Sequence, residues 1–279
     1  MNLHVINTGF FKLDGGAMFG VVPKSIWQKL NPADANNMCN WAMRCLLIED
    51  GNQLILIDNG IGKKQSANFF QYYYLNGDDS LTKSLNKLGF NEGDITDMFL
   101  SHLHFDHCGG GVKYEGEKLE IVFKNAKYWS NADHWKWATQ PNAREKASFL
   151  KENILPMQES GHLNFVEMDK PSPFKQFDLF LASGHTDKMM IPKIKYKDKT
   201  ICFVADLLPS VGHIPLPYVM GYDTRPLITL EEKERFLKEA AAKNYILFLE
   251  HDPVNECCTV AQTERGVRVD KSFPLKEIL

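Results

Sequence analysis

The chain has 279 residues, of which 44% are hydrophobic, enough to bury a sizeable core in one large domain or two small ones. Its 32 Lys and Arg residues against 35 Asp and Glu give a formal net charge of -3, which argues against nucleic acid as the main partner. No basic segment followed by an apolar one begins the chain, and no stretch approaches about 18 uninterrupted apolar residues. We therefore expect a cytoplasmic protein without a membrane partner, whose 6 cysteines are free thiols.

The first third of the chain alternates strand-like segments with turns. Strands are expected at residues 3–7, 17–22, 41–50 and 53–60. A hairpin turn is predicted at residues 49–52, because Asp-Gly-Asn is a strong turn signal. Apolar positions 81, 85 and 88, with Asp79 or Ser80 as the cap and Gly89 as a stop, predict a helix. A buried strand at 95–101 should then lead into the segment "HLHFDHCGG", at the end of the strand where open sheets place their sites.

The remainder repeats the order of strand, helix and strand. Residues 127–160 are polar and rich in Trp, Lys and Asn, which predicts a helical insertion broken by Pro141 and Pro156. Further strands are expected at 177–185, 193–197, 199–207 and 245–252, with an amphipathic helix at 229–244. Because no repeat or flexible linker separates the halves, we expect a single domain over residues 1–279.

A cluster of metal-binding side chains lies between residues 102 and 107. His102 and His104 are two positions apart, so their rings can share one cation, while Asp106 and His107 can serve a second. Neutral imidazoles and a carboxylate suit Zn²⁺, and Fe or Mn also fit this donor set. Two cations need more ligands than this one turn supplies.

Three more candidates stand at the ends of predicted strands. His185 follows "FDLFLAS", and His251 follows "YILFLE". Asp206 ends the run "TICFVA", and a carboxylate after a buried strand is costly unless it is paired or bound to a metal. Asp206 is therefore a candidate to bridge two ions.

The pieces "HLHFDH", "SGHTD", "FVADLL" and "LEHDP" together resemble the metallo-β-lactamase superfamily. The segments "FFKLDGGAMFGVVPK" and "LPSVGHIPLPYVMGYDTRP" look like the branch of quorum-quenching N-acyl-homoserine lactone lactonases and methyl parathion hydrolase. The resemblance implies an α/β fold, a four-layer αβ/βα sandwich of two mixed β-sheets flanked by helices, and a homodimer. It also implies two Zn²⁺ ions and assigns the ligands. The first ion would be held by His102, His104 and His185, and the second by Asp106, His107 and His251, with Asp206 between them.

Two such ions would activate a shared water as hydroxide for attack on a carbonyl or phosphorus centre. Asp106 and Asp206 are the expected catalytic carboxylates, Asp106 also as a guide for the proton. The function predicted first is a zinc-dependent lactonase acting on small-molecule substrates. Phosphotriesterase, thioesterase and phosphodiesterase activities of the same superfamily remain alternatives, as does a non-catalytic zinc-binding protein.

Residues for substrate binding are suggested by aromatic segments. The run "FFQYYYLNG" at 69–77 and the N-terminal Phe19 are candidates for an apolar pocket wall, with ordinary core packing as the alternative. His213, Tyr218 and Tyr222 belong to a segment expected to form a loop over the metals. Lactonases of the resembled branch carry a tyrosine three residues after the bridging aspartate, where this chain has Pro209. A different hydroxyl must substitute there, or the substrate differs. Asp187 likewise departs from the thioesterase pattern Gly-His-Thr-Pro-Gly.

Overall fold

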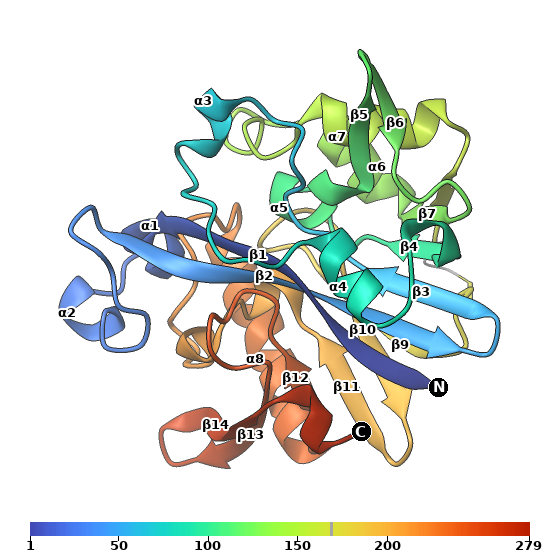
Figure 1. Ribbon diagram of the computed structural model, residues 1–279. Helices are drawn as coiled ribbons and strands as arrows, with labels where there is room; N and C mark the ends of the chain where they lie inside the picture. Colours follow the sequence, from blue (N-terminus) through green and yellow to red (C-terminus); the bar gives the residue numbers. More distant parts are fainter. Residues whose placement is uncertain (168–169) are drawn as a thin grey trace. The chain divides into compact units, whose positions relative to one another are not determined.

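The computed structural model describes residues 1–167 and 170–279 (Figure 1). Contacts between Cα atoms divide the chain into two compact units, each built from two segments. Unit 1 comprises Met1–Gly9 and Met43–Pro173, and unit 2 comprises Phe10–Ala42 and Phe174–Leu279. The chain therefore passes between the units within its first two long strands. The single domain expected from the sequence stays a prediction.

The sheet that forms the centre of unit 1 has six strands in the order β1-β2-β3-β4-β7-β8. These strands are β1 (Asn2–Asp14), β2 (Met38–Asp50), β3 (Gln53–Ile57), β4 (Asp97–Phe99), β7 (Lys127–Ser130) and β8 (Leu163–Phe165). The predicted hairpin joins β2 to β3 in antiparallel pairing, and Gly51 supplies the positive φ of 62° that its turn requires. From β3 to β8 the pairs are parallel. Leu47, Leu56 and Met98 from three of these strands are fully buried in the unit 1 core.

Short helices and a small ribbon complete unit 1. They are α3 (Ala67–Phe70), α4 (Leu81–Lys87), η1 (Glu92–Asp94), α5 (Phe105–Cys108), η2 (Gly109–Gly111), α6 (Ala132–Thr139) and α7 (Lys151–Glu159), with β5 (Val112–Glu115) paired to β6 (Lys118–Ile121). Figure 1 shows this ribbon beside α7. The Ser80 hydroxyl caps α4 by accepting a hydrogen bond from the Lys83 N–H group, as the sequence predicts.

The expected helical insertion at 127–160 is only partly correct. Lys127–Ser130 forms β7, because its backbone hydrogen-bonds in parallel to β4 and this long-range pairing overrides the polar composition. Helix α6 ends at Thr139, before Pro141 as predicted. Pro156, however, lies inside α7 rather than ending it, since the buried neighbours Ile154 and Met157 hold that helix against the core.

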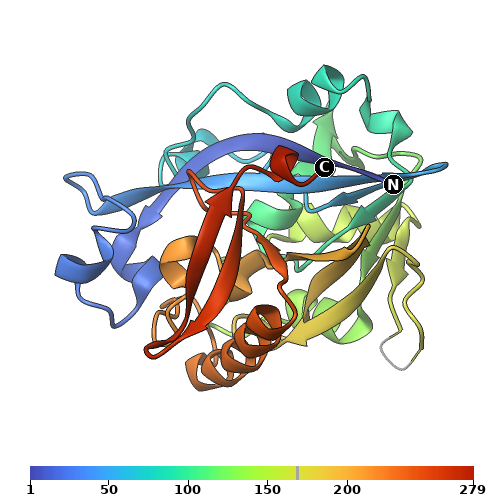
Figure 2. The ribbon, with the colours of Figure 1, turned by 90° about the horizontal axis from the view of Figure 1, so that it is seen from below.

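The sheet of unit 2 also has six strands, in the order β14-β13-β12-β11-β10-β9. They are β9 (Phe177–Ala182), β10 (Met189–Tyr196), β11 (Lys199–Phe203), β12 (Ile246–Phe248), β13 (Cys257–Thr263) and β14 (Gly266–Phe273). Strands β11 and β12 are parallel and are connected through the long helix α8 (Pro226–Ala242), whereas the other pairs are antiparallel. Figure 2 shows the β13–β14 hairpin beside α8. The predicted α/β class with two mixed sheets flanked by helices is confirmed.

The strand expected at 17–22 is wrong. The carboxylate of Asp14 accepts a hydrogen bond from the Ala17 N–H group at 2.8 Å and begins helix α1 (Gly15–Phe19) instead. Four short elements complete unit 2, namely α2 (Lys24–Trp27), η3 (Ala205–Leu207), η4 (Val211–His213) and η5 (Leu275–Glu277). None of the helices in the described ranges has the length and apolar character that crossing a membrane requires.

Candidate metal centre

The histidine cluster of unit 1 lies on a turn that follows β4. Close contacts between main chains fix this turn, because a Cβ atom on Gly109 would lie 2.2 Å from the carbonyl oxygen of Ile61. The Gly110 N–H group also donates to the carbonyl of Gly60 at 2.8 Å. Only glycine allows the two loops to approach this closely, which explains the glycine run after the histidines.

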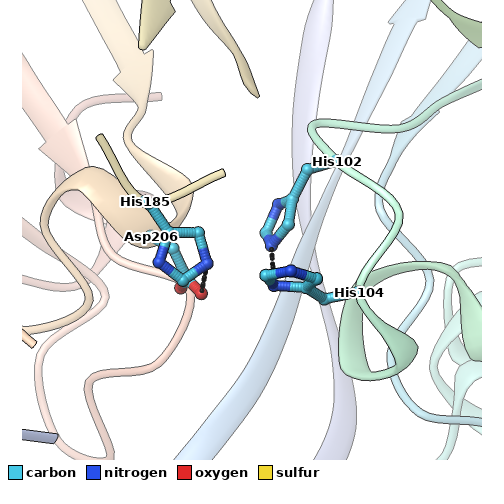
Figure 3. A group of neighbouring side chains, drawn as sticks. All are labelled: His102, His104, His185 and Asp206. Carbon is cyan, nitrogen blue, oxygen red and sulfur yellow. Dashed lines mark hydrogen bonds and ion pairs between the residues drawn. The ribbon is translucent and has the colours of Figure 1, made fainter. Parts of the chain in front are cut away.

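Within unit 1, the four predicted ligands lie as two adjacent pairs. His102 Nε2 is 3.1 Å from His104 Nδ1, the contact dashed in Figure 3, and His107 Nε2 is 3.7 Å from the Asp106 carboxylate. The ring centroids of His102 and His107 are 3.9 Å apart, so the pairs are neighbours. All four side chains are buried, with exposed fractions of 8% or less. Such a concentration of buried imidazole and carboxylate is suited to binding cations.

Asp58 organises this cluster, and the sequence prediction missed it. One of its carboxylate oxygens accepts hydrogen bonds from the Ser101 hydroxyl at 2.6 Å and from His107 Nδ1 at 3.0 Å. The other accepts the Ser101 N–H group at 2.7 Å. With Nδ1 protonated and bonded to Asp58, His107 would offer Nε2 to a metal. Asp58 follows the strand "QLILI" as Asp206 follows "TICFVA", and that shared position is the signal that could have identified it.

His104 has a similar carboxylate partner. Its Nε2 atom lies 3.4 Å from Glu145, which the Trp137 indole and the Asn142 amide hold with hydrogen bonds of 2.7 Å. A proton on Nε2 would make Nδ1 the ligand atom of His104, and Nδ1 is the atom that faces His102. The neighbouring His134 accepts the Leu103 N–H group and so fixes the backbone between the two histidines.

The predicted ligands of unit 2 converge on a single carboxylate. His185 Nε2 is 3.0 Å from Asp206 Oδ2, drawn in Figure 3, and His251 Nε2 is 3.0 Å from Asp206 Oδ1. Each oxygen of Asp206 therefore faces a different imidazole, as expected of a carboxylate that spans two ions. Asp206 lies in η3 directly after Ala205, whose φ of 42° turns the chain sharply at the end of β11.

The distal nitrogens of these two histidines are also fixed. His185 Nδ1 is 3.0 Å from Asp223, and His251 Nδ1 donates to the carbonyl of Ala42 at 2.8 Å. Burial by itself lowers the pKa of His185, but Asp206 and Asp223 outweigh it and raise that pKa to about 10. The carboxylates thus favour positive charge at the ring of His185, which a proton supplies and a bound divalent cation would also supply.

Two of the predicted substrate residues, Phe19 and His213, are packed within unit 2. Phe19 is fully buried, stacked on Trp27 with 5.5 Å between ring centroids and on His213 with 4.4 Å. Both nitrogens of His213 are bonded, to the Ser210 hydroxyl and to the carbonyl of Met18, and burial lowers its pKa to about 3. His213 is therefore a neutral packed ring.

The two predicted tyrosines are more accessible than these rings. Tyr218 is partly buried, and Tyr222 is 40% exposed. A role for them in substrate binding stays a prediction.

An aromatic cluster adjoins the ligand turn in unit 1. Phe69 and Tyr73, from the predicted aromatic segment, pack on Phe105 with ring centroids 5.3 and 4.8 Å away. Phe105 stands between His104 and Asp106 in the sequence. Burial first, and then the charge of Asp106, raise the pKa of Tyr73 to about 12. The Tyr73 hydroxyl is therefore a neutral hydrogen-bond donor within reach of the electrostatic field of Asp106.

Comparison with known proteins gives a family match over residues 44–251, to the model described as the Metallo-beta-lactamase superfamily. An N-acyl homoserine lactonase from Bacillus sp is 26% identical over 261 residues, which are 88% of this chain and 90% of the relative. An N-acyl homoserine lactonase from Bacillus cereus is 27% identical over 142 residues, so the chain matches about half, 50%, of that relative's length.

Two solved structures resemble the whole chain. A probable metal-dependent hydrolase from Staphylococcus aureus is 27% identical, with a TM-score of 0.88 and coverage of 98% of this chain and 96% of that one. AidC, described as a dizinc quorum-quenching lactonase in complex with a homoserine product, is 25% identical, with a TM-score of 0.78 over 98% of this chain and 95% of its own. These neighbours confirm the predicted fold and support the predicted class of metal-dependent hydrolase.

Proposed function

Because this chain belongs to the metallo-β-lactamase superfamily, we propose that it is a dinuclear metal-dependent hydrolase that opens lactones, with N-acyl-homoserine lactones as its substrate class. The observation that carries this proposal is the contact of both oxygens of Asp206 with different imidazoles, His185 and His251. A carboxylate positioned in this way is suited to span two cations. The similarity to lactonases over nearly the whole chain supplies the reaction class.

The ligand assignment is the one that membership of the family implies. One ion would take His102, His104 and His185, the other Asp106, His107 and His251, with Asp206 shared. The donor set fits zinc, because it offers neutral imidazole and carboxylate and no thiolate. The partners of the distal nitrogens support the same assignment, since each fixes the tautomer that leaves a ring nitrogen as ligand atom.

Bound divalent ions supply two functions, a lowered pKa for a shared water and polarisation of the carbonyl oxygen under attack. The chain's own residues fix the tautomers of the histidine ligands and handle the proton. Asp58 holds the proton of His107 on Nδ1, and the Ala42 carbonyl does the same for His251. The carboxylate of Asp106, at 8% exposure, would accept and pass on a proton in addition to its ligand role.

Tyr73 is our candidate for the hydroxyl that Pro209 cannot provide. Its ring packs on Phe105 at 4.8 Å, and Phe105 is flanked by two of the proposed ligands. With its pKa raised to about 12, the hydroxyl stays protonated at neutral pH and can donate to a carbonyl oxygen of the substrate. Phe69 and Phe105 would provide the apolar surface for the acyl chain.

Proton release from a long-chain N-acyl-homoserine lactone, followed with a pH indicator, tests the proposal. Zinc-reconstituted wild type should release one proton for each lactone opened, whereas Asp206→Ala should release none. A phosphotriester and a thioester serve as parallel substrates. Protein that carries two metals and opens no lactone, but cleaves either of those, would refute the lactonase assignment and leave the metal-dependent hydrolase in place.

A further inference from the structure

A cavity lies in unit 1, and none of the side chains assigned to the metals lines it. It has a volume of about 390 Å³ and lies between the loop that follows β3, the start of α4 and the strand β5. Its lining includes three lysines, Lys63, Lys64 and Lys113, and a single acidic residue, Glu92. Apolar side chains such as Leu81 and Val112 form the remaining wall. The cavity is thus large enough for a small metabolite and carries an excess of positive charge.

Lys64 is the most informative of these lysines. Its ammonium group donates a hydrogen bond to the carbonyl of Gly109, and within residues 1–167 and 170–279 no carboxylate forms an ion pair with it. Burial lowers its pKa to about 8, so the side chain is still mostly charged at pH 7. The negative charge of Glu152 raises this pKa but does not outweigh burial and forms no ion pair with Lys64, so an anion from solution would stabilise the partly buried ammonium.

The other charged groups that line the cavity do not neutralise its excess of positive charge. Lys63 lines the cavity, is exposed and forms no ion pair with any described carboxylate. Lys113 lies 3.8 Å from Glu92 and 3.9 Å from Glu115, distances that allow only weak pairing at the surface. Glu92 is itself engaged, since it accepts the Thr82 hydroxyl at 2.7 Å. Two of the three lysines that line the cavity therefore form no ion pair with a described carboxylate.

The cavity lies directly behind the metal-ligand turn. Lys64 binds the carbonyl of Gly109, and a Cβ atom on Gly62 would lie 2.5 Å from that same oxygen. The Asn59 N–H group donates to the carbonyl of His107 at 2.9 Å. An anion on Lys64 would therefore rest against the loop that supports two of the proposed metal ligands.

We propose that this cavity binds a doubly charged small-molecule anion, a phosphate monoester, between Lys63 and Lys64. Lysine ammonium groups act as point charges that suit phosphate oxygens, and two uncompensated charges match a phosphate dianion. The apolar wall accepts the organic part of the ester. This inference concerns a site separate from the catalytic one and holds whether or not the protein opens lactones.

Calorimetric titration of the zinc-loaded protein with glycerol 3-phosphate, at fixed ionic strength in chloride, tests this site. We expect one molecule bound per chain in the wild type, at least tenfold weaker binding in Lys64→Gln, and weaker binding in Lys63→Gln, whose exposed side chain can be changed without affecting folding. Lys151→Gln, an exposed lysine at the start of α7, is the matched control and should bind as the wild type does.

Three results would overturn the proposal. The first is the absence of binding heat in the wild type. The second is binding by Lys64→Gln as tight as by Lys151→Gln, which would place the phosphate on the metals or on the general surface. Succinate binding as tightly as the phosphate ester would show that the site selects charge alone and would contradict the assignment of a phosphate monoester. Glycerol serves as the neutral reference and should not bind.

Discussion

Substitution of Asp58 by Asn tests how the ligand turn of unit 1 is organised. Asp58 has a positive φ of 58°, a conformation that Asn adopts readily, so the change adds little backbone strain. It removes the negative charge and one of the two acceptor oxygens that serve Ser101 and His107. The side chain keeps its size, and the effect is therefore confined to hydrogen bonding and charge.

The geometry predicts that the substitution weakens metal binding. If the amide oxygen keeps the bond to the Ser101 N–H group, the NH₂ group faces His107 Nδ1 and forces that nitrogen to accept. The proton then moves to Nε2, the atom that we assign to the metal. If the amide flips, the buried Ser101 N–H group loses its acceptor. Loss of a charge-assisted hydrogen bond costs roughly 1.5–3 kcal/mol, and loss of such a partner typically weakens metal binding about 10- to 100-fold.

Competition for zinc with a chromophoric chelator at pH 7.5 measures this effect. Asp58→Asn should bind zinc about 10- to 100-fold more weakly than the wild type. Asp97→Asn is the matched control, because Asp97 in β4 is also buried, at 7% exposure against 0% for Asp58, but bonds to Trp129 and Thr96 instead of a histidine. Zinc affinity of Asp58→Asn equal to that of the control, with both proteins folded, would refute the role given to Asp58.

Three further substitutions or treatments have defined outcomes. Tyr73→Phe should lower kcat/KM for the lactone about 3- to 10-fold, the contribution of one neutral hydrogen bond. Tyr72→Phe, at a 67% exposed position, should leave kcat/KM unchanged. Equal activities of the two variants in a pH-indicator assay would exclude a role of the Tyr73 hydroxyl in binding the substrate. Lys233 is 1% exposed and donates to three backbone carbonyls, so Lys233→Met should lose roughly 2–4 kcal/mol in urea unfolding, while the exposed Lys238→Met on the same helix changes little. Burial lowers the pKa of Lys233 to about 7, so the unfolded chain binds the proton of this ammonium group more tightly than the folded chain does. The free energy of unfolding of the wild type relative to that of Lys233→Met should therefore increase as pH rises from about 7 towards 10. A difference between the two proteins that does not change with pH would contradict the lowered pKa. Cys108 is fully buried and burial raises its pKa to about 12, so an aromatic disulfide reagent should label it at pH 8 only after denaturation, and labelling at Cys108 itself in the native protein would disprove its burial.

Local signals made much of the fold and the ligand turn predictable. The hairpin at Gly51 and the cap at Ser80 depend on residues close together in sequence, and both are correct. The adjacency of His102, His104 and His107 is likewise a property of one short segment. Sequence spacing is a reliable guide in such cases because few residues intervene between the interacting groups.

Features that depend on long-range contacts were not predictable in the same way. Strand β7 is held by pairing with β4, about 30 positions away along the chain, and its composition alone indicated otherwise. Asp223 reaches His185 across 38 positions, and nothing in its surrounding sequence marks it as a histidine partner. The strand predicted at residues 17–22 failed for a local reason, since the cap formed by Asp14 was not recognised.

Metal stoichiometry tests the central claim most directly. The protein is stripped with a chelator, titrated with zinc and freed of excess metal. It should then carry two zinc ions per chain, as measured by elemental mass spectrometry. Asp206→Ala should lose both at equilibrium with a weak chelator, because the shared carboxylate belongs to both sites. A wild type that holds one zinc ion or none, or an Asp206→Ala variant that keeps two, would contradict a centre in which Asp206 joins two metals.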